Sequence, residues 1–416
     1  MVSFAALKLM TKKKYFLLIL ILGTLSAISP FSIDMYLPGF PAIAKDLNTT
    51  VAKVQLSLSS YFIGISIGQL FYGPLLDRFG RKQPLYFGLA LYLLASIGCA
   101  LAISVESLIV FRFLQALGGC VGLVASRAMI RDIFPVSEIA KVFSLLMLVI
   151  GVSPLLAPTL GGYVAVAFGW HYIFIILALM SALILAGVHY VLPESREPDK
   201  SILLKPKPIV KNFLTVLKTP QFYTYTFTGA IAASGLYAYI AGSPYVFMEI
   251  YKVSAEHYGW IFALIAVGII GSSQLNTILL RRFKSEQIIV GALICQSITG
   301  LFLVTGAYFG FTGLGSTIFL IFIFLCCQGF SFPNSSALAL TPFIRNAGSA
   351  SALLGSFQMA LGAVATVMVS VLSNHTALPM TGVMAFCAIC SLSVLLIGRR
   401  IMQNSPLKPY KVLETL

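Results

Sequence analysis

The sequence predicts an all-α polytopic membrane protein with twelve transmembrane helices in two six-helix halves. Three observations support this prediction. Of the 416 residues, 58% are hydrophobic and only 10% are charged, whereas a soluble domain has about one quarter of its residues charged. Twelve apolar segments follow one another, and each can cross a hydrocarbon core of about 30 Å as a helix. One long polar stretch, residues 193–220, separates the first six segments from the last six.

The twelve predicted spans follow in order along the chain. They are residues 15–38, 52–73, 84–104, 108–130, 141–165, 171–192, 222–243, 257–279, 287–308, 313–335, 346–372 and 377–398. The first follows a run of lysines, as a signal peptide would. It is too long for a signal peptide, however, and no small-residue cleavage pattern follows it, so we expect a retained span.

The polar stretch divides the chain into two halves and a linker. We expect an N-terminal half over 1–192, a cytoplasmic linker over 193–221, and a C-terminal half over 222–416 that ends in a short cytoplasmic tail. Two six-helix halves are typical of a transporter built from internal repeats. Because such a pair is sufficient by itself, we expect a monomer.

The net charge of +15 is distributed very unevenly. With connecting segments assigned alternately to two sides, the side that holds both termini receives 23 of the 28 lysines and arginines. The other side receives three, and Arg112 and Arg127 lie within the fourth segment. The positive-inside rule therefore predicts that both termini are cytoplasmic. The basic excess is an orientation signal and not a nucleic-acid footprint, with anionic lipid headgroups as secondary contacts.

The sequence argues against an enzyme. The four histidines are dispersed, and no catalytic or metal-ligand spacing emerges. The cysteines fall in apolar segments, and the spaced pair Cys387 and Cys390 has no second pair or histidine to complete a metal site. No phosphate-binding G-x-x-x-x-G-K-[ST] motif is present, so ATP is not the energy source. We therefore expect no metal, cofactor or nucleic acid. A channel would need rings of like polar groups and a sensor an output domain, and neither is found.

The second apolar segment ends in Gly68 to Lys82, GQLFYGPLLDRFGRK. Its glycines permit a close helix approach and a tight turn, and its charges can form a latch at the cytoplasmic face. The alternative is an ordinary positive-inside loop. The candidate gating residues here are Gly73, Asp77, Arg78, Gly80, Arg81 and Lys82.

The fourth segment contains Arg112, several residues inside the span, and Gln115, one helical turn further on. A cation at that depth costs a few kcal/mol unless it faces water or a partner. Spacing of three residues lets both side chains face the same way. The alternative is an arginine that snorkels to the interface, with Glu106 as its ion-pair partner.

The fifth segment, GVSPLLAPTLGG over 151–162, combines prolines and glycines within a span. Membrane helices tolerate these residues, which bend a helix and let neighbours pack closely. Pro154, Pro158, Gly161 and Gly162 are therefore candidates for conformational gating. A packing kink without a coupling role is the alternative.

These three motifs resemble the loop signature, the fourth-helix proton-transfer motif and the fifth-helix antiporter motif of the major facilitator superfamily. In the last of these, Ala157 stands where glycine usually precedes Pro158. Further runs are similar to the bicyclomycin-resistance (Bcr/CflA) subfamily of drug exporters: 32–38 (SIDMYLP), 72–74 (YGP), 129–134 (MIRDIF), 170–174 (WHYIF), 241–245 (AGSPY) and 332–336 (FPNSS).

The resemblance implies a multi-pass proton antiporter of the bacterial inner membrane that works by alternating access. It implies that Asp77 and Arg78 hold the outward-open state by contacting a neighbouring helix. Related exporters carry a second acid in the first helix, at the place of Ser26 here. We therefore expect at most one proton to be coupled through this helix.

Asp34 is the only one of the thirteen acids that lies within a span. One interpretation is an interfacial residue at the helix end, since Pro38 and Pro41 follow closely. The functional hypothesis is that Asp34 faces a central cavity and exchanges a proton, because low dielectric favours the neutral form of a carboxyl group. Arg112, if close, would favour the charged form, and its partner is either Asp34 or another group.

The cargo site should be aromatic and amide-rich, since such walls adapt to amphipathic molecules and offer hydrogen bonds without charge. Packing or interfacial roles are the alternative for each such residue. The candidates are Tyr61, Gln115, Met147, Tyr237, Tyr239, Asn334 and Gln358. The predicted cargo is a drug or a similar small amphipathic molecule; the alternative is an endogenous metabolite such as an amino acid.

Overall fold

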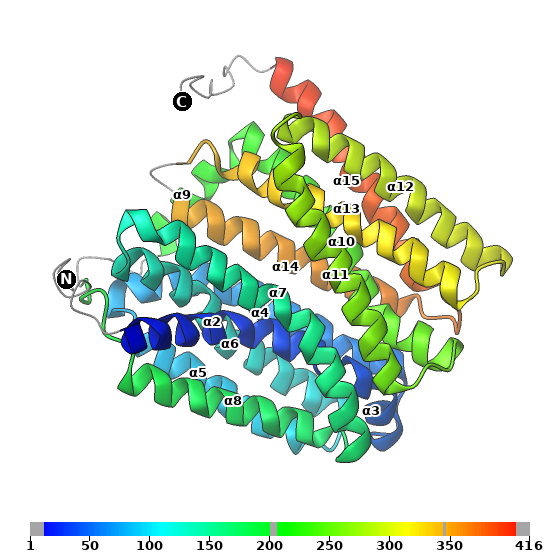
Figure 1. The fold of residues 1–416 in the computed structure, drawn as a ribbon, viewed down its shortest axis with the longest axis horizontal. Coiled ribbons are helices and arrows are strands. Elements are labelled where there is room, and N and C mark those ends of the chain that lie inside the picture. The colour runs from blue at the N-terminus through cyan, green and yellow to red at the C-terminus, as the bar shows by residue number, and fades with distance from the viewer. Residues whose placement is uncertain (1–11, 200–205, 344–346, 405–416) are drawn as a thin grey trace. The chain divides into compact units, whose positions relative to one another are not determined.

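The computed structural model describes residues 12–199, 206–343 and 347–404. Over these residues every regular element is a helix and none is a strand (Figure 1). The predicted all-α class is therefore confirmed.

The first part of the described chain contains seven α-helices and one short 3₁₀ turn. They are α2 (Lys12–Asp34), η1 (Leu37–Gly39), α3 (Phe40–Asp46), α4 (Val51–Phe79), α5 (Lys82–Ala100), α6 (Val105–Ile133), α7 (Val136–Ala167) and α8 (His171–Tyr190). The remaining elements are α9 (Pro206–Leu217), α10 (Pro220–Pro244), the π-helical η2 (Tyr245–Ile250), α11 (Ala255–Leu279), α12 (Ser285–Phe309), α13 (Leu314–Leu340), α14 (Ala347–Val371) and α15 (Leu378–Asn404).

Among the described residues, eleven helices are long and apolar enough to cross a membrane. Each of the eleven corresponds to one of the twelve expected spans. The expected span without a counterpart among them is the seventh, 222–243. That segment forms α10, which carries several tyrosines, threonines and serines among its apolar residues. A helix therefore occupies every predicted span.

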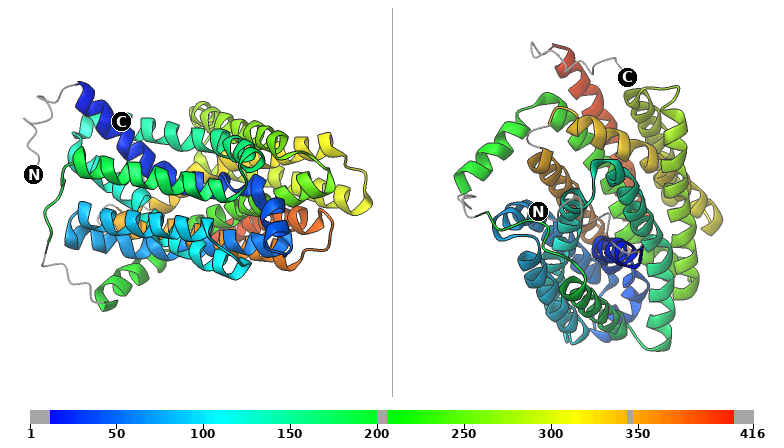
Figure 2. Two further views of the ribbon diagram at one scale, coloured as in Figure 1. Left: turned by 90° about the horizontal axis from the view of Figure 1, so that it is seen from below. Right: turned by 60° about the vertical axis from the view of Figure 1, so that its left-hand side comes forward.

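The described chain divides into two compact units. The first contains the residues before the gap at 200–205 together with Ser243–Ala266, and the second contains the rest. Within each unit the long helices run side by side, as the turned views of Figure 2 show. The first half of α11 thus packs with the first unit, although it follows the linker in the chain.

Glycines let the helices of the first unit approach each other closely. A Cβ added at Gly118 of α6 would lie 2.5 Å from the carbonyl oxygen of Gly88 on α5, and 2.6 Å from the amide nitrogen of Tyr92. A Cβ at Gly64 of α4 would lie 2.7 Å from the Cβ of Ala116. Backbone-to-backbone packing of this kind replaces the hydrophobic driving force that lipid does not supply.

The two units differ in the polar groups that they bury. The buried charged side chains of the described chain are Asp34, Arg81 and Arg112, and all three belong to the first unit. The described interior of the second unit holds hydroxyl and amide groups instead, among them Gln296 and Asn334. Any ionic chemistry inside the described bundle therefore resides in the first unit.

We expect Gly118→Ala to destabilise the protein by about 1–3 kcal/mol, because the new methyl group has no space between α5 and α6. Unfolding of the purified protein in detergent measures this. Gly291→Ala on α12 is the matched control, since its Cβ would meet nothing within 4 Å. Equal stability of the two variants would contradict the packing assigned to Gly118.

Candidate functional site

Arg112 of α6 is fully buried inside the first unit. Its Nη1 donates to Oε1 of Gln115 at 2.5 Å, and its Nη2 donates to the carbonyl oxygen of Ser32 on α2 at 2.9 Å. No ion pair of the described residues involves Arg112. It is therefore neither a snorkelling arginine paired with Glu106 nor a salt-bridge partner of Asp34.

Aromatic rings replace a counter-ion around Arg112. Its guanidinium carbon lies 4.2 Å from the ring centre of Tyr36, 4.1 Å from that of Tyr61 and 5.8 Å from that of Phe174. A desolvated cation over an aromatic face gains about 2 kcal/mol. The three rings come from the turn between α2 and η1, from α4 and from α8, so the cation of α6 joins four parts of the unit.

A ring of hydrogen bonds orients the guanidinium. Gln115 accepts from Arg112 and donates through Nε2 to Oγ of Ser96 at 2.7 Å. Ser96 donates to the carbonyl oxygen of Tyr92 at 2.7 Å, and the hydroxyl groups of Tyr92 and Ser32 lie 2.6 Å apart. Ser32 closes the ring through its carbonyl oxygen. Ser32, Tyr92 and Ser96 carry no sequence signal for this role, since isolated serines and tyrosines are common in membrane helices.

Asp34 is the last residue of α2, and its side chain is buried with 4% of the residue exposed. The helix does end there, as the interfacial interpretation supposed, but the carboxylate does not lie at an exposed surface. No described cation lies within ion-pair distance of it. Tyr258 of α11 is close enough to interact with it electrostatically. The structure thus provides a buried carboxyl group without a counter-ion.

The glycines of α7 fix the backbone next to Asp34. A Cβ at Gly161 would overlap the carbonyl oxygen of Met35, and one at Gly162 would lie 2.6 Å from the carbonyl oxygen of Ala255. Both glycines therefore allow α7 to pack directly against the ends of other helices of the unit. Pro158 and Pro154 lie one and two turns before Gly161 in the same helix.

The predicted latch residues meet in a cluster of charges. Arg81 is 4% exposed; its Nε donates to Asp132 at 2.7 Å and its Nη1 donates to Asp77 at 2.9 Å. Asp77 also accepts from Arg196 at 3.0 Å. Burial works to lower the pKa of Arg81, but the hydrogen bonds and charges of Asp132 and Asp77 outweigh it and raise the pKa. Arg81 therefore stays charged and holds α4 and α6 together.

Glu194 completes the latch from the segment after α8. Its carboxylate accepts from the backbone N–H groups of Arg81 at 2.7 Å and Lys82 at 3.0 Å, where α5 begins. Gly80 adopts φ +82° to make this turn, and a Cβ there would lie 3.1 Å from Oε2 of Glu194. The start of the predicted linker, with Glu194 and Arg196, is therefore part of the latch. Sequence reasoning missed this role because Glu194 is more than a hundred residues away in the chain.

The other gating residues predicted in this motif do not share one set of contacts. Lys82 donates through Nζ to the carbonyl oxygen of His189 at 3.4 Å. Arg78 makes further interactions. A Cβ at Gly73 would meet nothing within 4 Å, so close packing does not explain this glycine.

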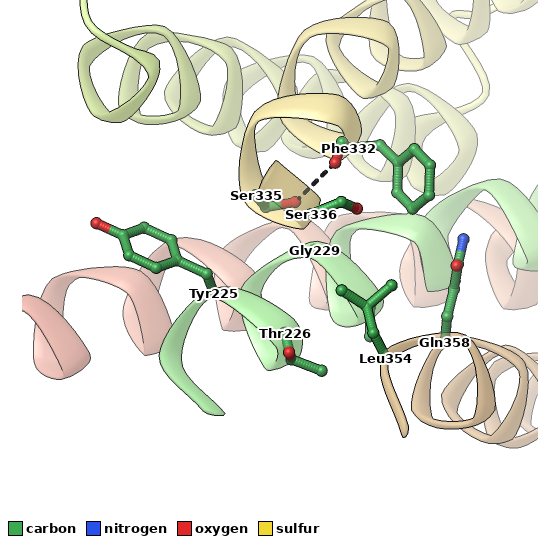
Figure 3. A pocket seen from close by; sticks show the side chains of 9 residues that line it. Tyr225, Thr226, Gly229, Phe332, Ser335, Ser336, Leu354 and Gln358 are labelled. Atoms are coloured by element: carbon green, nitrogen blue, oxygen red, sulfur yellow. Dashed lines mark hydrogen bonds between the residues drawn. The ribbon is translucent and has the colours of Figure 1, made fainter. Parts of the chain in front are cut away.

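In the second unit, Gln358 of α14 donates to the hydroxyl group of Tyr237 on α10 at 3.4 Å. Gln358 also lines a small cavity with Thr226, Ser335 and Leu354 (Figure 3). The cavity measures about 10 Å³, which is room for one water molecule. The hydroxyl group of Thr226 is buried and has no hydrogen-bond partner in the described part of the chain, so the site suits a neutral hydrogen-bonding group.

The remaining predicted cargo residues belong to both units. Tyr61 and Gln115 are fully buried against Arg112. Met147 of α7 is 49% exposed. Asn334 of α13 donates to Oδ1 of Asn276 on α11 at 2.7 Å, and Tyr239 is buried on α10. The structure therefore splits these candidates between the two units.

Comparison with known proteins adds a family match. The model of the Major Facilitator Superfamily matches residues 22–367. A "Bicyclomycin resistance protein homolog" of Haemophilus influenzae is 33% identical over 91% of this chain and 95% of its own length. The "Uncharacterized MFS-type transporter YdgK" of Bacillus subtilis is 34% identical over 95% of this chain and 99% of its own. "Multidrug resistance protein MdtL" of Escherichia coli is 31% identical over 88% and 92%.

Solved structures share the fold at low identity. A D-xylose–proton symporter superposes with a TM-score of 0.72 at 15% identity, covering 94% of this chain and 98% of its own. A bacterial homologue of the lysosomal transporter Spinster reaches 0.67 at 14% identity, covering 94% and 96%. These likenesses support the fold alone.

We expect Glu194→Ala to speed hydrogen exchange of the amides of Arg81 and Lys82. Loss of an N-terminal cap costs about 1 kcal/mol, which corresponds to roughly fivefold faster exchange. Exchange of the peptide over residues 79–84 measures this. Glu197→Ala is the control, because the described residues show no hydrogen bond or ion pair of that side chain. Unchanged exchange in Glu194→Ala would remove Glu194 from the latch.

Proposed function

Because the chain belongs to the major facilitator superfamily, we propose that it is a proton-coupled antiporter that exports drugs or similar small amphipathic molecules by alternating access. The resemblance stated from the motifs is confirmed, and the chain is a multi-pass transporter, not an enzyme. The observation that carries the proposal is that Asp34 is a buried carboxyl group with no counter-ion among the described residues.

The coupling step follows from the energetics of Asp34. A carboxylate removed from water without a cationic partner costs several kcal/mol, and protonation removes that cost. The charge state of Asp34 therefore depends on whether water reaches it. We propose that the carboxylate is ionised while cargo binds from the cytoplasm or the inner leaflet, and that a proton from the opposite side neutralises it as cargo leaves.

Arg112 serves this cycle as a positioning residue. It binds the carbonyl oxygen of Ser32, two residues before Asp34, and it is held by three aromatic rings. It therefore fixes the end of α2 without forming an ion pair with Asp34. The charged latch around Arg81 and the proline-containing helix α7 would then change as the site alternates.

The cargo is proposed from relatives and from the residues present. The names of two relatives refer to bicyclomycin resistance and multidrug resistance, which favours drugs over an endogenous metabolite such as an amino acid. The second unit offers Tyr237, Asn334 and Gln358 as neutral hydrogen-bonding groups. Met147 of the first unit adds an exposed, polarisable side chain, and Tyr239 is a buried aromatic residue of the second unit.

We propose the bacterial inner membrane as the location, with a monomer as the working form and both termini in the cytoplasm. The 23 basic residues on the side of the termini support this orientation. A net positive charge that moves from outside the cell to the cytoplasm releases about 2.3 kcal/mol per 100 mV of membrane potential. Exchange of one proton for a neutral molecule would therefore use the potential as well as the pH gradient.

We expect Asp34→Asn to abolish accumulation of an amphipathic antibiotic driven by a pH gradient in proteoliposomes, because an amide cannot take up the proton. Asp46→Asn is the control and should transport normally. Nε1 of Trp170 donates to Oδ2 of Asp46 at 3.1 Å, and the amide oxygen of an asparagine can accept the same hydrogen bond. The proposal fails if Asp34→Asn pumps at full rate. Amino acids tested in the same vesicles distinguish the metabolite alternative.

We expect at most one proton to enter for each molecule exported. Ser26 occupies the place of a second acid, and its hydroxyl group lies 2.7 Å from that of Ser126 inside the unit. Simultaneous measurement of internal pH and exported cargo gives the ratio, and a firm value of two would exclude a single coupling site in α2.

A further inference from the structure

The turn between α11 and α12 forms a basic pocket that the transport cycle does not use. The pocket has a volume of about 600 Å³ and belongs wholly to the second unit. Leu280, Phe283, Ser285, Glu286 and Leu338 line it together with three cations, Arg281, Arg282 and Lys284. We call it the α11–α12 basic pocket.

The three cations have no anion of their own. No ion pair of the described residues involves Arg281, Arg282 or Lys284, and all three are exposed. The pocket therefore presents uncompensated positive charge.

The single acid of the pocket is already occupied. One oxygen of Glu286 accepts from the hydroxyl group of Tyr225 at 3.0 Å, and the other lies 3.9 Å from Nη2 of Arg399. Glu286 thus holds α10, α12 and α15 together at this end of the unit. It is not free to neutralise the three cations.

The apolar residues around the cations distinguish a lipid from a free anion. Phe283 is 50% exposed and Leu280 is 43% exposed beside the charged groups. The outer face of α11 continues this apolar surface through Ile278 at 57% and Leu275 at 55%. A soluble phosphate would leave that surface bare, whereas a phospholipid would cover it with its acyl chains.

We propose that the α11–α12 basic pocket binds the headgroup of an anionic phospholipid. Arginine matches phosphate oxygens with two parallel hydrogen bonds, and lysine adds a point charge. Basic pockets between transmembrane helices are known to hold such headgroups. The acyl chains lie along the exposed face of α11. Bound lipid bridges the ends of α11 and α12 and stabilises the second unit.

The test is thermal unfolding of the full chain in detergent while dioleoylphosphatidylglycerol is added. We expect this lipid to raise the melting temperature in a saturable manner. The variant R281Q/R282Q/K284Q should weaken the apparent affinity at least about tenfold, because each basic residue contributes to headgroup binding. The control K45Q/K53Q/K252Q removes the same charge from the other loops and should bind as the parent does.

Two further titrations distinguish an anionic phospholipid from a neutral lipid and from free phosphate. Dioleoylphosphatidylcholine should give no comparable shift, and inorganic phosphate at the same concentration should give none. A full shift with inorganic phosphate would replace the lipid with a soluble anion and overturn the proposal. Equal loss of affinity in the two triple variants would also overturn it, because any cation would then suffice.

A second measurement does not depend on variants. Phosphatidylglycerol with a photoactivatable acyl chain should cross-link to peptides that contain Leu275, Ile278 or Phe283. Cross-links spread evenly over the exposed helices would contradict a defined site.

Discussion

The buried guanidinium of Arg112 is the interaction on which the first unit depends. A cation without a counter-ion can remain inside a membrane protein only if its hydrogen bonds and its surroundings compensate for lost water. Here the compensation comes from the carbonyl oxygen of Ser32, the amide of Gln115 and three aromatic rings on separate elements. Each of these groups must be in place at once, so the relative positions of α2, α4, α6 and α8 are closely specified. The same constraint sets where the end of α2, and with it Asp34, lies.

The two units bury different kinds of polar group. The first unit holds the buried charges of the described chain, and its helices meet through glycines at Gly88, Gly118 and Gly161. The second unit buries hydroxyl and amide groups, such as the pair Asn276 and Asn334. In the proposed cycle, the group that carries the proton and the neutral hydrogen-bonding groups of Asn334 and Gln358 therefore lie in different units. Such an arrangement lets the cargo vary without disturbing the group proposed to carry the proton.

Much of the fold followed from apolar length alone, because a span must satisfy its own backbone hydrogen bonds and can only be a helix. Asp34 and Arg112 were found because charge within a span is costly and hence conspicuous. The residues that these side chains contact elsewhere in the fold could not be predicted from the sequence. Gln115 was assigned to the cargo site but supports Arg112, because helical spacing gives the face of a side chain and not the neighbour it meets. Glu194 and Asp132 joined the latch through contacts across the unit, which no local pattern encodes.

The unpaired charge of Arg112 also bears on what the protein must keep out. At an effective dielectric constant of 20, a unit positive charge repels a monovalent cation 10 Å away by about 2 kcal/mol. The local concentration of potassium or sodium ions falls by more than roughly tenfold at that energy. Aromatic rings and backbone oxygens solvate the arginine without cancelling its field at a distance, as a carboxylate partner would. The aromatic cage therefore leaves a positive potential around Arg112, which disfavours small cations in that part of the first unit.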